Sequence, residues 1–194
     1  MKIAVVQAST QISKNEMLFE YTKKYAKNSE VTNYGCFADD KENYSYLEIA
    51  LFIGMLIDSR KADFVVTGCS SGQGMMLACN SMPGVLCGYT PTPKDAYLFA
   101  RINNGNAVSL PLGEEYTYSG KENLEETLKA LFSEPFGGGY PKSEAKRKIT
   151  DSEKLKHIRR ESQIDFREFL NMLDEGMVTK VRRLFERRVK LCSK

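Results

Sequence analysis

Apolar and polar positions alternate in blocks along the first two thirds of the chain. Short apolar runs rich in β-branched residues, typical of buried strands, occur at 2–6, 30–34, 63–67, 84–88 and 106–111. Between them, apolar residues recur at helical spacing over 13–27, 44–59, 75–79, 93–102 and 121–132. Strands that alternate with helices in this way predict parallel βαβ units and a mostly parallel sheet covered on both faces.

Two local signals predict where elements begin and end. Ser13 is followed three residues later by Glu16, which is the spacing of a capping box and predicts the start of the first helix. Residues 135–141 combine two prolines with three glycines and interrupt the alternation. We therefore divide the chain into a domain over residues 1–147 and a helical C-terminal extension over residues 148–194.

The extension is charged and has helical periodicity over residues 151–190. It carries two apolar stripes, and Gly176 between them is predicted to end the first helix. Apolar stripes need a surface to cover them, so we expect a helical hairpin docked on the core or on a partner subunit, and we favour the partner subunit. The stripes comprise Phe166, Phe169, Leu170 and Leu173, then Val178, Val181, Leu184, Phe185 and Val189.

Composition is that of an ordinary globular protein, with 42% hydrophobic residues in 194. No apolar run is long enough to span a bilayer, and the N-terminus does not resemble a signal peptide, so we expect a cytoplasmic protein without a membrane partner. Five cysteines, an odd number without zinc-ligand spacing, predict reduced thiols rather than disulfides or a metal site. They lie at positions 36, 69, 79, 87 and 192.

The net charge of +3 hides a basic C-terminal region. Residues 146–194 contain 15 Lys and Arg against 8 Asp and Glu, whereas the rest of the chain contains 13 against 17. Such a region can serve a nucleic acid, an acidic partner or a phosphate ligand. A solvated helical surface is the simpler interpretation, and no basic run is interleaved with aromatic residues as single-strand binding requires.

The segment with most chemistry is residues 68–74, Gly-Cys-Ser-Ser-Gly-Gln-Gly, between a predicted strand and a predicted helix. At the carboxyl edge of a parallel sheet such loops bind ligands, and the helix N-terminus offers N–H donors to an anion. We place Cys69 in the loop rather than on a buried strand, where the helix terminus favours its thiolate as a base or nucleophile. A small packed thiol is the alternative. Neither a Walker A loop nor a dinucleotide fingerprint is present, which disfavours a nucleotide cofactor.

This loop, with the small-residue helix and Asn80 behind it, resembles the Gly-Cys-Gly-Thr-Gly-x-Gly … Asn segment of the ribose-5-phosphate isomerase B and galactose-6-phosphate isomerase family. Residues 83–85, 95–101 and 103–107 extend the resemblance, which covers roughly residues 1–147. The C-terminal extension is similar to that of a longer subgroup. The resemblance implies an α/β fold, a Rossmann-like three-layer sandwich with a mostly parallel five-stranded sheet, plus a C-terminal helical extension.

That family interconverts aldose and ketose phosphates through an enediolate, without a metal or other cofactor. The resemblance implies Cys69 as the base and Ser71 in place of a family threonine at the enediolate oxygen. It also implies a phosphorylated sugar as substrate and a homodimer or tetramer with sites at the subunit interface. The implied substrate-binding residues are Gln7, Ser9, Tyr46, Gly68, Ser70, Gly72, Gln73, Gly74, Asn103, Asn104 and Arg147.

Two positions depart from the family. The short enzymes carry an Asp-His pair after the first strand, where this chain has Gln7 and Ser9, and a ring-opening histidine where it has Asn103. The one histidine here is His157, in the extension. An amide cannot transfer a proton at neutral pH as an imidazole can. Either the substrate differs, another group opens the sugar ring, or turnover is slow or lost.

Three functions therefore compete. An aldose–ketose isomerase agrees with Cys69 and Ser71. A catalytically impaired protein that binds a sugar phosphate agrees with the missing histidines. A nucleic-acid binder rests on the basic extension alone and ranks last, so we expect no nucleic-acid partner.

Overall fold

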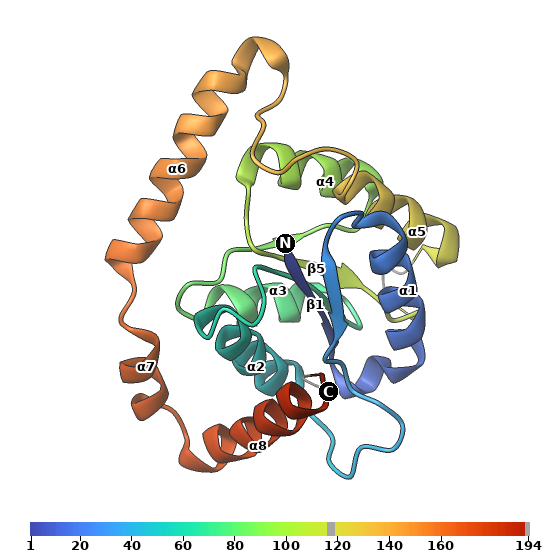
Figure 1. Cartoon of the computed structure of the whole chain (residues 1–194), viewed down its shortest axis with the longest axis vertical. Helices are drawn as coiled ribbons and strands as arrows, with labels where there is room; N and C mark the ends of the chain where they lie inside the picture. The colour runs from blue at the N-terminus through green and yellow to red at the C-terminus, as the bar shows by residue number, and fades with distance from the viewer. Residues whose placement is uncertain (116–118, 193–194) are drawn as a thin grey trace.

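Five strands form one wholly parallel sheet in the order β2-β1-β3-β5-β4 (Figure 1). The computed structural model describes residues 1–115 and 119–192. The sheet confirms the predicted α/β class and the number of strands. Its members are β1 (Lys2–Gln7), β2 (Glu30–Asn33), β3 (Phe64–Cys69), β4 (Cys87–Tyr89) and β5 (Ala107–Pro111).

Helices cover both faces of the sheet, as a three-layer sandwich requires. On one face, apolar residues of the sheet pack with those of α2 (Tyr46–Asp58), α3 (Gln73–Asn80) and the C-terminal helices. On the other face they pack with α1 (Asn15–Tyr25), α4 (Pro93–Leu98) and α5 (Gly120–Leu131). The remaining short helical segments are η1 (Ser9–Lys14), the π-helix η2 (Phe99–Asn103) and η3 (Lys142–Glu144).

The strand register decides which residues can share a site. Gln7 of β1 lies opposite Gly68 of β3, and Cys69 lies opposite Pro111 of β5. Three carboxyl ends therefore meet at one edge of the sheet, the edge where ligands bind in open α/β proteins. The amino ends, where Val65 faces Ala107, form the opposite edge.

Two predicted boundaries were wrong for local reasons. The helix at 13–27 begins only at Asn15, because residues 9–14 form a 3-10 segment, and Ser13 provides no cap. The strand at 84–88 begins only at Cys87, because Gly84 turns the chain with a φ of +78°. A complete capping box does occur, between Ser45 and the third residue of α2.

Three helices form the extension: α6 (Ala145–Ser162), α7 (Phe166–Met172) and α8 (Glu175–Cys192). Their apolar stripes pack on the chain's own core, so the predicted burial against another subunit was wrong for α7 and α8. Val181 and Leu184 are at most 1% exposed, and a Cβ on Gly54 of α2 would come within 2.7 Å of the Phe166 ring. Gly176 lies inside the first turn of α8 rather than at a helix end, because Asp174 caps that turn through the N–H of Met177 at 2.8 Å.

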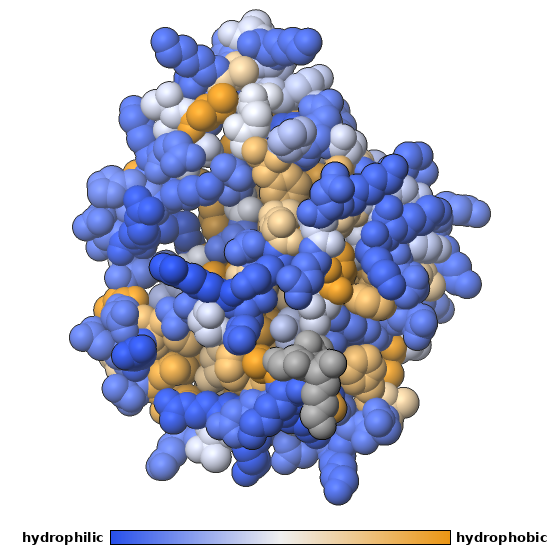
Figure 2. Space-filling view, in the orientation of Figure 1, coloured by the Kyte–Doolittle hydropathy of each residue, from blue (hydrophilic) through white to orange (hydrophobic). Residues whose placement is uncertain are grey.

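α6 differs from the other two helices because it stands away from the sheet as a long arm (Figure 1). Its Leu155 and Ile158 are exposed, and apolar side chains reach the surface along this arm in Figure 2. The predicted domain division after residue 147 falls inside α6 and stays a prediction. Within the described ranges, every helix is too short or too polar to cross a membrane.

Candidate active site

The turn between β3 and α3 is tight because glycine permits its backbone path. Only Ser70, Ser71 and Gly72 separate strand from helix. Gly72 has a φ of +75°, and a Cβ there would lie 2.8 Å from the ring of Tyr89 and 2.9 Å from the carbonyl carbon of Leu110. Any other residue would meet both strain and collision. No side chain caps α3, so the turn presents N–H groups that have no acceptor within the helix.

Cys69 is the last residue of β3 and is only 9% exposed. The prediction that it lies in an open loop rather than on a buried strand was wrong, because β3 continues through Gly68 and pairs Cys69 with Pro111. Cys69 clusters with Tyr44 and Met75, so its side chain lies on the face of the sheet that α2 and α3 cover. The thiol thus sits at the carboxyl edge, immediately before the glycine turn.

Ser70 connects this turn to a hollow of about 320 Å³. The amide of Gln11 donates to Ser70 Oγ at 2.9 Å, and the Gly113 N–H donates to the Ser70 carbonyl at 2.9 Å. Ser71 follows and is partly exposed. Sequence reasoning missed Gln11, although a polar residue just beyond the first strand was a signal that could have found it. The hollow is lined by Gln11, Ser13, Lys14, Ser70, Leu112, Gly113, Glu114 and Glu115.

Tyr46 reaches the glycine turn from a different element. It is the first residue of α2, and a Cβ on Gly74 would lie 3.6 Å from its ring. Tyr46 is 42% exposed, so part of its surface is open to solvent. The structure therefore brings together Cys69, Tyr46 and the turn, as the resemblance implied. Gln73 directly follows the turn in the sequence and is exposed on the first turn of α3.

Gln7 and Ser9 have structural partners. Gln7 is completely buried, its amide donates to the Cys36 carbonyl at 2.8 Å, and it accepts from the amide of Asn15 at 2.7 Å. A direct role for Gln7 in substrate binding therefore disagrees with the structure, because its side chain has no open face. Ser9 is partly buried and its Oγ accepts from the N–H of Tyr44 at 2.7 Å. Both residues instead hold the loop that leads to α2.

Asn103 and Asn104 lie at the opposite edge of the sheet. They end η2, just before β5 begins at Ala107, whereas Cys69 faces Pro111 at the other end of that strand. Four residues at about 3.3 Å each separate the two levels, or about 13 Å along the strand. Within one chain these two asparagines therefore lie at the opposite end of β5 from Cys69.

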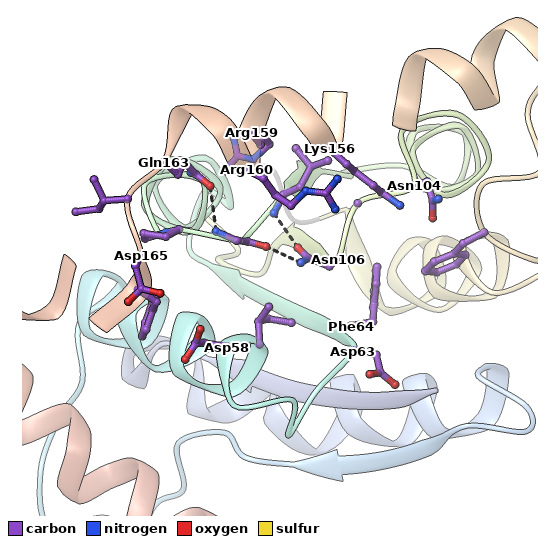
Figure 3. Close-up of a pocket in the computed structure, with 18 of the residues that line it drawn as sticks. Asp58, Asp63, Phe64, Asn104, Asn106, Lys156, Arg159, Arg160, Gln163 and Asp165 are labelled. Atoms are coloured by element: carbon purple, nitrogen blue, oxygen red, sulfur yellow. Dashed lines mark hydrogen bonds between the residues drawn. The ribbon is translucent and has the colours of Figure 1, made fainter. Parts of the chain in front are cut away.

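Arg147 also lies away from the glycine turn. It occupies the first turn of α6, where its guanidinium pairs with Glu144 at 2.8 Å and Asp151 at 3.0 Å. A cavity of about 710 Å³ opens between α6 and the amino edge of the sheet (Figure 3). The charged and amide side chains in its lining are Asp58, Asp63, Asn104, Asn106, Lys156, Arg159, Arg160, Gln163 and Asp165.

The other thiols and the histidine contribute little to the site. Burial raises the pKa of Cys36, and a hydrogen bond with Cys79 together with burial raises the pKa of Cys87, so both thiols are poor nucleophiles. The side chain of the fifth cysteine, at position 192, is outside the described part. His157 is exposed on α6, 3.7 Å from Glu161. In residues 1–115 and 119–192, no three His, Cys, Asp or Glu residues converge in a way that could hold a metal ion.

Comparison with known proteins places these features in a family. The ribose/galactose isomerase family matches residues 3–150. None of the curated proteins compared with the chain matches it. A solved 4-deoxy-L-threo-5-hexosulose-uronate ketol-isomerase, complexed with a tartrate, is 36% identical, with a TM-score of 0.87 over 97% of this chain and 92% of that one.

A second solved structure, the ribose-5-phosphate isomerase of Vibrio parahaemolyticus, is 32% identical, with a TM-score of 0.85 over 97% of this chain and 92% of that one. The type B ribose 5-phosphate isomerase of Trypanosoma cruzi, 23% identical over 82% of this chain and 98% of that one, shares the fold with a TM-score of 0.66. The first two similarities extend through the C-terminal helices, whereas the family match ends in α6. The chain belongs to the ribose/galactose isomerase family and is an aldose–ketose isomerase.

Proposed function

We propose that this isomerase works at the edge formed by Cys69 and the glycine turn, with the Cys69 thiolate as the base. In the aldose-to-ketose direction the thiolate removes the proton from C2 and leaves an enediolate. The same proton returns to C1, while the proton of the 2-hydroxyl moves to O1, so no atom is gained or lost. The observation that carries this proposal is the position of Cys69, 9% exposed, at the carboxyl end of β3 and at the start of the glycine turn into α3, whose N-cap residue Gly72 has no capping side chain.

The turn suits the negative charge that develops on oxygen during this reaction. The first N–H groups of α3 have no intrahelical acceptor, and the helix dipole favours an anion at that end. Fixed donors of this kind stabilise an oxyanion without having to reorganise. Ser71 supplies a hydroxyl at the turn, and the Tyr46 ring supplies a wall beside Gly74.

A phosphorylated pentose or hexose is the first candidate substrate. The residues proposed to bind it are Asn103 and Asn104, at the amino edge of the sheet, and Arg147, in the first turn of α6. A second copy of the chain would have to present this edge to Cys69 of the first copy. We therefore propose a homodimer or a larger even assembly, in which each active site combines the glycine turn of one chain with the amino edge of another.

An open-chain uronate is the second candidate, favoured by the 36% identity to a ketol-isomerase for 4-deoxy-L-threo-5-hexosulose uronate over nearly the whole chain. That sugar has no hydroxyl at C4 and a ketone at C5, so it cannot close a five- or six-membered ring on C1. An enzyme for such a substrate needs no group to open a ring closed on the aldehyde carbon C1. This agrees with Asn103 in place of a ring-opening histidine and with His157 exposed on α6.

The test is to incubate the purified protein with ribose 5-phosphate, galactose 6-phosphate and the hexosulose uronate, and to follow ketose formation from each. Turnover that disappears in Cys69→Ala, while the melting temperature is retained, supports the proposed base. The preferred compound decides between phosphate and uronate. Undiminished turnover in Cys69→Ala would reject the thiol as the base. Melting shifts with all three compounds but no turnover would indicate a protein that only binds sugar.

A further inference from the structure

The basic face of α8 lies against the loop that leads into the active site. Lys180, Arg183, Arg187 and Arg188 recur at helical spacing and therefore share one face of the helix. Opposite them are residues 37–48, which comprise the end of the connection from β2 to α2 and the first turn of α2, and which carry several carboxylates. Figure 1 shows α8 beside α2, and the ion pairs described below connect segments about 140 residues apart in the sequence. Several basic residues of the extension thus form hydrogen bonds and ion pairs within the chain.

A buried ion pair anchors the middle of this loop. The guanidinium of Arg188 donates to the carboxylate of Asp40, and both side chains are at most 6% exposed. Arg187 donates to the other oxygen of that carboxylate at 3.0 Å. Asp40 in turn accepts from the N–H of Phe37 at 2.9 Å, and the Arg188 guanidinium lies 4.6 Å from the centre of the Phe37 ring. This anchor fixes the fold of the loop but does not contact the glycine turn.

Lys180 acts closer to the turn. Its ammonium donates to the Asn43 carbonyl at 2.7 Å and pairs with Glu48 at 2.7 Å. Glu48 also accepts from the N–H of Ser45 at 2.8 Å, and its own N–H donates to the Ser45 hydroxyl at 3.3 Å. One lysine therefore binds both Asn43, two residues before the helix cap Ser45, and the carboxylate of Glu48 that completes the cap. Tyr46, whose ring borders Gly74, lies between those two tied points.

We propose that Lys180 of α8 is a positioning residue for the active site, because it fixes the first turn of α2 and thereby holds the Tyr46 ring beside the glycine turn. This inference rests on the proposed function only in taking that turn as the place where substrate binds. It gives the C-terminal extension a role in shaping the substrate pocket as well as in covering the core.

Lys180→Met tests the inference, because it keeps the aliphatic stem and removes the ammonium. We expect kcat/KM to fall about tenfold, mainly through KM, since a displacement of about 1 Å at a site can cost up to about 100-fold. Glu48→Gln should give a similar loss from the other side of the pair, because glutamine can still complete a capping box. Arg183→Met is the matched control. It removes one charge from the same helix face, but its pair with Glu42 is 3.4 Å long and exposed, so its kinetics should equal those of wild type.

A double-mutant cycle with Tyr46→Ala separates positioning from stability. If Lys180 acts through Tyr46, Lys180→Met should change kcat/KM little in the Tyr46→Ala protein, although it lowers the melting temperature in both backgrounds. Wild-type KM and kcat in both Lys180→Met and Glu48→Gln would overturn the inference, and so would fully additive losses in the cycle. A wild-type protein without isomerase activity on any of the three sugars would instead reject the proposed function.

Discussion

Gly72 provides the sharpest test of how the glycine turn is built, because the chain contains a matched control. Gly72→Ala would place a residue with a side chain at φ +75° and bring its Cβ within 2.9 Å of three atoms of Tyr89, Leu110 and Pro111. Gly84 has nearly the same φ, +78°, but a Cβ there would meet nothing within 4 Å. The two substitutions share the backbone strain, and only the first adds a collision.

The magnitudes follow from these two terms. A left-handed conformation costs a residue with a side chain about 1–2 kcal/mol, so Gly84→Ala should lower the free energy of unfolding by that amount. Overpacking in a filled site adds about 1–3 kcal/mol, so Gly72→Ala should lose about 2–5 kcal/mol in all. A domain in the middle or upper part of the ordinary range of stability, about 5–15 kcal/mol, would still fold with this loss.

Urea denaturation of the two variants and the wild-type protein measures both terms. Isomerase activity should fall in Gly72→Ala, because the turn must move the N–H groups of α3, and should be retained in Gly84→Ala. Equal losses of unfolding free energy in the two variants would refute the steric argument. Full activity in Gly72→Ala would show that the turn need not be as tight as the structure has it.

Two further predictions concern the contacts of α8. Arg188→Met should lower the free energy of unfolding by less than the about 3–5 kcal/mol expected for a buried charge left unpaired, because Arg187 still pairs with Asp40, and Asp40→Asn combined with Arg188→Met should recover part of the loss in urea denaturation. Glu48 predicts a pH dependence: burial alone would raise its pKa, but the hydrogen bonds with Lys180 and the N–H of Ser45 outweigh burial and hold the pKa below the usual 4.5. A carboxylate whose pKa is lower in the folded than in the unfolded chain stabilises the fold at pH values above the unfolded pKa. The stability difference between wild type and Lys180→Met should therefore be full at pH 6. It should shrink as the pH falls below about 4.5 and through the pKa of Glu48 in the folded protein. A difference that stays constant between pH 6 and pH 3 would contradict this.

Local signals predicted the sheet because each strand is a short apolar run. They predicted the glycine turn because glycine permits backbone conformations that other residues adopt rarely. The same signals failed where the start or end of a helix depends on other residues. Ser13 has capping-box spacing, but residues 9–14 adopt a 3-10 path, whereas Ser45 and Glu48 complete a box that Lys180 also supports. Gly176 resembles a helix stop, yet the cap of α8 comes from Asp174.

Some features of the candidate site could likewise be predicted from the sequence, and others could not. Cys69 and the glycines are adjacent in sequence, so their motif can be recognised from the order of residues alone. Three other features depend on strand register and on side chains far apart in the chain. They are the burial of Gln7, the hydrogen bond from Gln11 to Ser70, and the location of Asn104 at the opposite edge of the sheet. Residue spacing carries no information about such contacts.

The sequence by itself determined the order of strands and helices along the chain and the glycine turn, because these follow from short-range patterns of apolar residues and glycine, and the motif at that turn carries the resemblance to the family. Only the tertiary structure decided that Cys69 ends a buried strand, that the stripes of α7 and α8 cover the chain's own core, and that basic residues of α8 bind the loop before α2. The physical reason is that burial and ion pairing depend on which surfaces meet in space. Segments about 140 residues apart in the sequence, such as α8 and the loop before α2, meet only in the folded chain.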